Sequence, residues 1–112
     1  AEVDLPVFVS TPDLLVDLPE ARWLPVVVDP QRWATERAPF AGRERPLVVH
    51  IPSRTIVKGT DLIDPVLHGL AAEGLIDYRS ITGLSNDEMV AAYGEADIVV
   101  DQLRLGIYGV AA

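Results

Sequence analysis

The sequence has no cysteine, a single lysine and only two histidines in 112 residues. A chain without cysteine forms neither disulfides nor the cysteine-based zinc sites of small metal-stabilised modules, so both classes are excluded. A chain of this length buries roughly 65% of its unfolded surface, which is enough for one hydrophobic core. The sequence therefore predicts a single domain's worth of chain that is held together by packing alone.

Long apolar runs and clustered positive charge are also absent. No stretch approaches the ~20 apolar residues of a membrane-spanning helix, and the N-terminus lacks the layout of a signal peptide. We therefore expect a soluble, cytoplasmic protein without a transmembrane segment. Nine basic residues against 17 acidic ones give a net charge of −8. This balance argues against a nucleic-acid surface and leaves open only a local basic pocket.

The second half of the chain alternates short apolar segments with amphipathic ones. The apolar segments predict strands over 47–51, 75–81 and 96–101, the last buried on both faces. Helices are predicted between them, over 60–73 and 85–95. The order β-α-β-α-β with short connections predicts an α/β fold with a parallel sheet and flanking helices.

Capping residues suggest where these helices begin. Thr60 is the expected N-cap of the first helix. Pro65 fits poorly inside that helix, so either it kinks the first turn or the regular helix starts there with Asp64 as the cap. Ser85 and Glu88 have the spacing of a capping box, which predicts the start of the second helix.

Proline interrupts the first half, because eight of the nine prolines lie at or before Pro52. A short helix is expected over 12–18 and an extended stretch over 22–29, which Pro25 confines to a sheet edge or an irregular strand. Residues 30–46 mix charge, proline and glycine with little periodicity. We interpret them as a linker.

Ligands of parallel α/β sheets bind at the carboxyl ends of the strands, which here are followed by the loops 52–60, 82–86 and 102–108. The first loop carries Arg54 and Lys58 beside a predicted helix N-terminus. Positive side chains near free backbone N–H groups suit a phosphate. The alternative is that both residues are ordinary solvated loop charges.

Other polar and aromatic residues carry weaker signals. Asp101 follows an apolar strand at the same sheet edge, and it serves either a ligand or the capping of its own loop. His50 lies within a strand, which is typical of a buried histidine with satisfied hydrogen bonds. Trp23 and Trp33 are interpreted as packing anchors. The sequence contains no Gly-x-Ser-x-Gly, P-loop or Gly-x-Gly-x-x-Gly pattern.

Several short motifs follow one another in a characteristic order. They are Val49-His50-Ile51-Pro52-Ser53, Lys58-Gly59-Thr60, Ile81-Thr82-Gly83-Leu84-Ser85, Ala96-Asp97-Ile98, Asp101-Gln102 and Gly106-Ile107-Tyr108-Gly109-Val110. In order and spacing they resemble glycosyltransferases of the GT-B fold, in the group often labelled family 4 or glycosyl transferases group 1. The resemblance implies that residues 1–45 are the end of an N-terminal domain, a hinge and a linker. It implies that residues 46–112 are part of a Rossmann-like nucleotide-sugar-binding domain.

The resemblance also implies a set of donor-binding residues. Arg54 and Lys58 would neutralise the diphosphate of the donor. Thr82 and Gly83 lie in the stretch whose backbone approaches the nucleotide base, and Gly109 matches the glycine that opens a phosphate-receiving helix. The full predicted set is Ser53, Arg54, Lys58, Thr82, Gly83, Asp101 and Gly109.

The function implied by the resemblance is transfer of a sugar from a nucleoside-diphosphate sugar to an acceptor, with retention and without metal or cofactor. The first donor-site glutamate of the family would fall at Gly106 and the second beyond Ala112. We therefore expect a fragment of a glycosyltransferase, without catalytic residues of its own and with doubtful activity alone. The alternative is a noncatalytic α/β binding or assembly module, which the missing glutamates favour.

We also expect the chain to form a homo-oligomer. If the sheet stops after the strand over 96–101, an edge and a helix-binding surface stay uncovered. An apolar tail follows that strand and consists of Leu103, Leu105, Ile107, Tyr108 and Val110. The alternative is that residues 3–28 fold back and cover this surface within one molecule.

Overall fold

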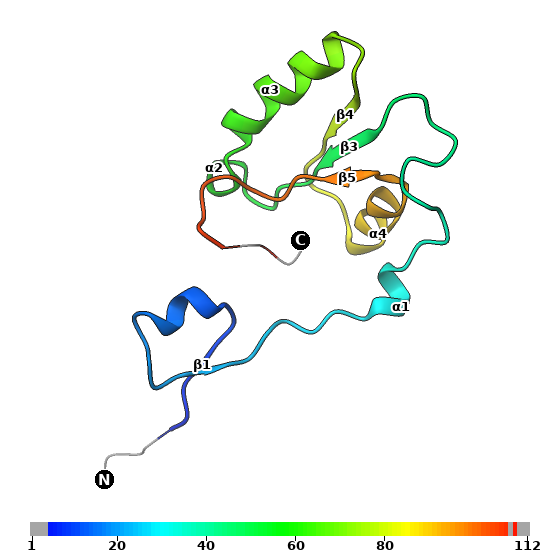
Figure 1. Ribbon diagram of the computed structural model, residues 1–112. Coiled ribbons are helices and arrows are strands. Elements are labelled where there is room, and N and C mark those ends of the chain that lie inside the picture. Colours follow the sequence, from blue (N-terminus) through cyan, green and yellow to red (C-terminus); the bar gives the residue numbers. More distant parts are fainter. Residues whose placement is uncertain (1–4, 108, 110–112) are drawn as a thin grey trace.

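The computed structural model describes residues 5–107 and 109, and its centre is a three-stranded parallel sheet. Strand β3 (Leu47–His50) lies in the middle, between β4 (Asp77–Ser80) and β5 (Ile98–Val99) (Figure 1). Both neighbours pair with β3 in parallel. The chain is therefore a mixed α/β protein, and the predicted parallel β-α-β-α-β order is confirmed.

Two helices, α3 (Thr60–Ala72) and α4 (Asn86–Glu95), lie on opposite faces of this sheet (Figure 1). The chain moves from β3 to one side for β4, and then crosses to the other side for β5. Crossovers of one hand in opposite directions place their helices on opposite faces. The predicted capping box opens α4: Glu88 N–H donates to the Ser85 hydroxyl at 3.3 Å, and Ser85 N–H donates to the Glu88 carboxylate at 2.8 Å.

The start of α3 differs from the prediction. Thr60 is the first helical residue and not the N-cap, because Gly59 takes the cap position with a φ of 75°. The Thr60 hydroxyl contacts His50 instead of capping the helix. Pro65 lies inside the helix, so the alternative of a later start at Pro65 is wrong. The preceding segment, predicted as loop, contains the single helical turn α2 (Thr55–Lys58).

The core is centred on β3, all four of whose residues are buried. Val48 and Val49 pack there together with Ile63 of α3. The third strand was expected to be buried on both faces, but Ile98 and Val99 are 40% and 37% exposed. β5 is a short strand at the edge of the described sheet, and it pairs only with β3. The prediction of full burial is therefore wrong.

Residues 5–28 form a small unit apart from the three-stranded sheet (Figure 1). It contains β1 (Phe8–Val9), the 3₁₀ helix η1 (Pro12–Leu15) and β2 (Arg22–Trp23). The two strands pair in parallel, and Val9 is their one buried residue. This unit therefore buries little of its own apolar surface.

The elements of this unit are shorter than predicted. The helix expected over 12–18 ends at Leu15, and within the stretch expected over 22–29 only Arg22 and Trp23 pair with β1. Pro25 has no N–H to donate to a neighbouring strand, which limits the pairing. The whole molecule measures 64 × 32 × 22 Å with a radius of gyration of 17.6 Å. A compact chain of this length would have about 13 Å, so the small unit extends the molecule.

Residues 30–46, predicted as a linker, contain one helical turn, α1 (Pro30–Trp33). Asp29 caps this turn, because its carboxylate accepts a hydrogen bond from Gln31 N–H at 3.0 Å. Proline at the first helical position supports the same start, since its missing N–H would have no helical partner there. The segment interpreted as a linker therefore contains one helical turn.

Asp97, just before β5, connects residues 37–47 to the sheet. Its fully buried carboxylate accepts hydrogen bonds from the backbone N–H groups of Leu47 at 2.7 Å and Phe40 at 2.8 Å. It also forms ion pairs with Arg37 at 2.7 Å and Arg43 at 3.4 Å. The amides of Leu47 and Phe40, followed by Arg37, hold the pKa of Asp97 well below its usual range.

Candidate functional site

Separate chain segments meet at the carboxyl end of the central sheet. β3 leads through Ser53 to α2, whose last residue is Lys58, and β5 leads to Asp101. The N–H of Leu103 donates to the Lys58 carbonyl at 3.2 Å, which ties the loop after β5 to α2. The strand order reverses at β3, and open parallel sheets bind ligands outside their strand ends at such a point.

Lys58 and Asp101 form an ion pair at this position. The Lys58 Nζ lies 2.5 Å from Asp101 Oδ1, and the two side chains are only 16% and 13% exposed. The backbone N–H of Gly109 donates to the other oxygen of the same carboxylate. A Cβ at Gly109 would lie 2.6 Å from Lys58 Nζ, so a larger residue there would force the side chains of the ion pair to shift.

A cavity of about 780 Å³ opens beside this ion pair. Ser53, Lys58 and Asp101 line it, and its further polar groups come from Asp29, Arg32 and Asn86. Its apolar lining consists of Val26, Val27, Val28, Trp33, Ile51, Met89, Tyr93 and Val99. Ligand cavities typically combine such an apolar lining with a few polar groups, and this volume suits a nucleotide-sized molecule.

Trp33 and Tyr93 connect α1 to α4 along this cavity. Their ring centroids are 5.8 Å apart with planes inclined by 43°, which supports the interpretation of Trp33 as a packing anchor. Burial and, secondarily, the charge of Asp101 raise the pKa of Tyr93, so its hydroxyl stays protonated. Sequence reasoning did not place Tyr93 or Arg32 at the site. No local pattern indicated that α1 would fold against α4.

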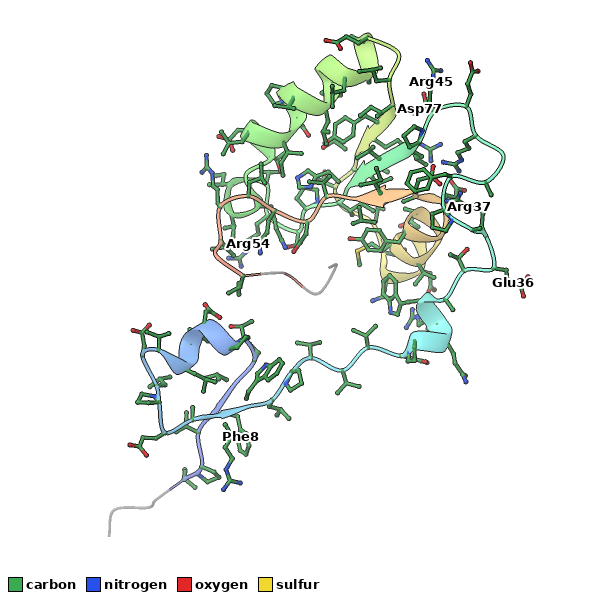
Figure 2. The ribbon with its side chains drawn as sticks, viewed as in Figure 1. Phe8, Glu36, Arg37, Arg45, Arg54 and Asp77 are labelled. Atoms are coloured by element: carbon green, nitrogen blue, oxygen red, sulfur yellow. The ribbon has the colours of Figure 1, made fainter. Side chains whose placement is uncertain are left out.

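Of the seven predicted donor-binding residues, Gly109 contacts the ion pair without lining the cavity, and three others lie away from both the ion pair and the lining. Arg54 is exposed at the N-cap position of α2 (Figure 2). Thr82 and Gly83 are exposed between β4 and α4, where Gly83 has a φ of 76°. The remaining four predicted residues come together, and they are Ser53, Lys58, Asp101 and Gly109.

His50 is completely buried directly behind this site. Its Nδ1 lies 2.8 Å from the Val100 carbonyl oxygen, and because a carbonyl only accepts, Nδ1 carries the proton. Its Nε2 then accepts a hydrogen bond from the Thr60 hydroxyl at 2.9 Å. Both ring nitrogens have partners, so the prediction of a satisfied buried histidine is confirmed.

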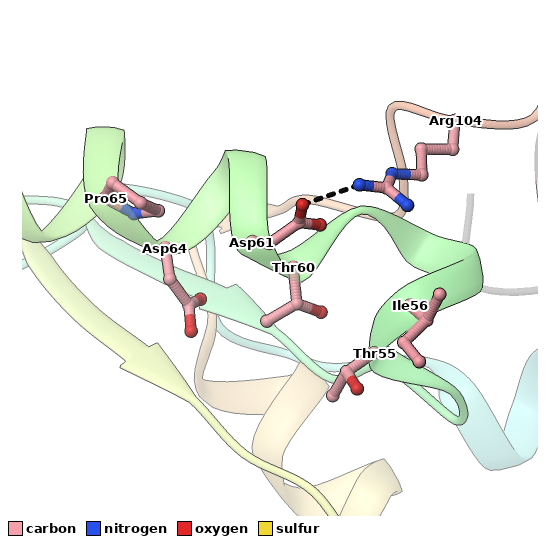
Figure 3. Close-up of a pocket in the computed structure, with 7 residues that line it drawn as sticks. All are labelled: Thr55, Ile56, Thr60, Asp61, Asp64, Pro65 and Arg104. Carbon is pink, nitrogen blue, oxygen red and sulfur yellow. Dashed lines mark hydrogen bonds and ion pairs between the residues drawn. The ribbon is translucent and has the colours of Figure 1, made fainter.

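A second hollow, of about 450 Å³, lies along the first turns of α3 (Figure 3). Its acidic groups already have partners: Asp61 pairs with Arg104 at 2.5 Å, and Asp64 accepts a hydrogen bond from the Tyr78 hydroxyl at 2.7 Å. Burial and then this hydrogen bond raise the pKa of Tyr78. We therefore assign the candidate site to the larger cavity.

Two further observations and the comparisons with known proteins complete the description. Among the described residues, no three histidine or carboxylate groups are placed to hold a metal ion. In the same part of the chain, no helix has the length and apolarity to cross a membrane. No family model, no curated protein and no solved structure matches the chain. Any functional proposal therefore rests on the geometry of the site and on the sequence motifs.

Proposed function

We propose that the chain carries the diphosphate end of a nucleotide-sugar site and belongs to a glycosyltransferase of the GT-B type. In this proposal, residues 46–112 are part of its Rossmann-like donor domain. The supporting observation is that Ser53, Lys58, Asp101 and Gly109 meet at the carboxyl end of a parallel sheet. All four lie in motifs that resemble the family, and they come from two segments whose paired residues, Lys58 and Asp101, are 43 positions apart in the sequence.

Lys58 would stabilise the leaving group of the transfer reaction. As the bond between the sugar and the donor breaks, negative charge accumulates on the departing diphosphate. A preorganised ammonium group opposes that charge, and its effect is stronger where little water screens it. Because only 16% of the Lys58 side chain is exposed, it would act in such surroundings. We propose that this positive charge serves a metal-independent reaction.

The apolar part of the cavity would receive the nucleoside. The flat face of a base packs well on aliphatic and aromatic side chains, and Val27, Trp33 and Tyr93 offer both kinds. The protonated Tyr93 hydroxyl would be available as a hydrogen-bond donor. The sugar and its acceptor stay undefined in this proposal.

Binding of nucleoside diphosphates tests the proposal. Titration calorimetry at low salt with UDP, GDP and ADP compares the wild type with Lys58→Gln. Loss of a charge-assisted hydrogen bond of about 1.5–3 kcal/mol lowers affinity about 10- to 100-fold. Arg45→Gln is the matched control, because Arg45 pairs with Asp77 at 3.3 Å at the opposite end of the sheet (Figure 2). Unchanged affinity in Lys58→Gln would refute the proposal.

Arg54→Gln provides a second comparison with Lys58→Gln. Since Arg54 does not line the cavity, its replacement should weaken binding less than replacement of Lys58. An equal loss in both variants would mean that the α2 turn rearranges when the ligand binds.

A noncatalytic binding or assembly module is the second candidate function. It is supported by two observations: the charge of Lys58 is already matched by Asp101, and residues 5–28 expose many apolar side chains. Nucleoside diphosphates would then leave the melting temperature unchanged even at millimolar concentration. Light scattering would instead show a mass that rises with protein concentration.

A further inference from the structure

The carboxylate of Asp101 receives the same hydrogen-bond donors that a bound phosphate would use. Lys58 Nζ lies 2.5 Å from one of its oxygens, and the N–H of Gly109 donates to the other. An ammonium group and a backbone N–H on two oxygens of one anion are typical of protein phosphate sites. The carboxylate therefore stands in the place of a ligand oxygen pair.

Hydrogen bonds of the loop after β5 hold these groups together. Leu103 N–H donates to the Lys58 carbonyl at 3.2 Å, and Gln102 Nε2 donates to the Ile107 carbonyl at 2.5 Å. The backbone of Gly109 lies so close to the ion pair that even a methyl group would overlap it. The two donors are thus preorganised by the chain and already occupied.

Any phosphate that approaches Lys58 also approaches the negative charge of Asp101. The two side chains line the same cavity, and both are mostly buried, so water screens the repulsion weakly. A phosphate must therefore either tolerate this repulsion or take over the donors that Asp101 now uses.

We infer that Asp101 is an internal competitor, whose carboxylate occupies Lys58 and Gly109 until the phosphate of a ligand displaces it. This inference rests on the proposed function and adds a control of affinity and selectivity to it. A free phosphate gains little by displacing Asp101, since it exchanges one anion for another. A nucleoside diphosphate also contacts the apolar lining, and that extra contact favours the displacement.

Calorimetric titration with inorganic pyrophosphate tests the competition directly. Asp101→Asn removes the charge, keeps the shape and leaves an oxygen that still accepts from Gly109. We expect this variant to bind pyrophosphate about tenfold more tightly than the wild type or better, which corresponds to about 1.4 kcal/mol. In Asp101→Asn the preference for UDP over pyrophosphate should shrink, because the competitor is gone.

Asp61→Asn is the matched control, because Asp61 pairs with Arg104 at the same 2.5 Å and the substitution changes the net charge equally. Equal affinities of Asp101→Asn and Asp61→Asn would overturn the inference, and so would weaker binding by Asp101→Asn. Adding Lys58→Gln to Asp101→Asn should abolish the gain. If Lys58→Gln alone binds both UDP and pyrophosphate like the wild type, the proposed function fails as well.

A measurement on the wild type covers the case in which Asp101→Asn does not fold. The amide resonance of Gly109 should move as pyrophosphate saturates the protein, because its hydrogen-bond acceptor changes from a carboxylate to a phosphate. Gly69, within α3, serves as the reference amide and should not move. A stationary Gly109 resonance at saturation would overturn the inference.

Discussion

Two sets of parallel strands in this molecule have very different surroundings. β3 lies between two strands with a helix on each face, and all four of its residues are buried. Among the described residues, β1 pairs only with β2, and Phe8 and Trp23 of these strands are 50% and 49% exposed. Parallel strands normally need cover on both faces. Parallel pairing alone therefore does not make a core, and the unit of residues 5–28 needs a further surface to pack against.

The apolar residues of the chain are accordingly divided between a core and a surface. The exposed set in residues 5–28 comprises Leu5, Val7, Phe8, Leu14, Val16, Leu18, Trp23, Leu24, Val26, Val27 and Val28. Leu103 and Leu105 of the expected apolar tail are also exposed and Ile107 is partly exposed, whereas Tyr108 and Val110 lie outside the described residues. So many exposed apolar side chains within one short segment favour an interaction site there.

The largest effect we predict is self-association through this surface. Light scattering over a concentration series should show the mass rising from 12.2 kDa to at least twice that value by high micromolar concentration. Val16→Lys, at a side chain that is 85% exposed, should keep the fold and shift the rise to higher concentration. A constant mass would mean that the surface is covered within one molecule, and the contrast between the two regions would then disappear.

The second prediction concerns the attachment of residues 37–47 to the sheet. Asp97→Ala leaves the buried N–H groups of Leu47 and Phe40 without acceptors, so we expect the melting temperature to fall by roughly 10 °C or more. Differential scanning calorimetry measures this change. Asp17→Ala, in the small N-terminal unit, is the control and should leave the melting temperature nearly unchanged. A small effect of Asp97→Ala would mean that this segment contributes little to the core.

The pH dependence of the Asp97→Ala difference follows from the lowered pKa of Asp97. Because the carboxylate ionises more readily in the folded state, its contribution is complete above the pKa of an unfolded aspartate, about 4. The contribution is lost as the pH falls through the lower folded value. The difference in melting temperature between the wild type and Asp97→Ala should therefore shrink from pH 5 to pH 2, and a constant difference would contradict this account.

The third prediction uses one substitution in both regions. Val49 is 1% exposed in the core, and Val27 is 89% exposed. Val49→Ala removes two packed methyl groups and should lower the free energy of unfolding by about 2 kcal/mol, whereas Val27→Ala should change it by less than about 0.5 kcal/mol. Urea denaturation measures both values. Similar losses would show that residues around Val27 are packed in solution.

The smallest effect is expected at the capping box of α4. Ser85→Ala removes the hydroxyl that accepts from Glu88 N–H and should lower the melting temperature by about 4 °C. Ser85 also donates its hydroxyl to the Glu88 carboxylate at 2.7 Å, and the hydrogen bonds of Glu88 with Ser85 lower the pKa of Glu88. This part of the stabilisation is present above about pH 4.3 and is lost in acid. The difference between the melts of Ser85→Ala and the wild type should therefore shrink as the pH falls, and a constant difference would contradict the role of Glu88.

Local sequence patterns predicted those helices and strands whose formation depends on residues within the element itself. The apolar residues of β3 and the Ser85–Glu88 pair are examples. The same reasoning misassigned Thr60, because its hydroxyl finds His50 across the fold and not a neighbouring amide. It missed α2 because a single turn is too short to show a helical period.

The candidate site was predictable to a similar extent. The position of Lys58 and Asp101 after parallel strands was sufficient to place them at one sheet edge. Their pairing was not predicted, since the sequence does not state which loop charge will face which other. The contact of Trp33 with Tyr93 depends on how residues 30–46 fold back, and proline-rich segments give no periodic signal for that.

The hydrogen bonds of the buried His50 connect the core to both segments that supply the site. One ring nitrogen contacts Val100, the residue before Asp101, and the other contacts Thr60, two positions after Lys58. A backbone movement that separates the segment of Lys58 from the segment of Asp101 would also change the distance between these two anchors. The environment of the His50 imidazole, which is shielded from solvent, should therefore differ according to whether the segments of Lys58 and Asp101 are together or apart.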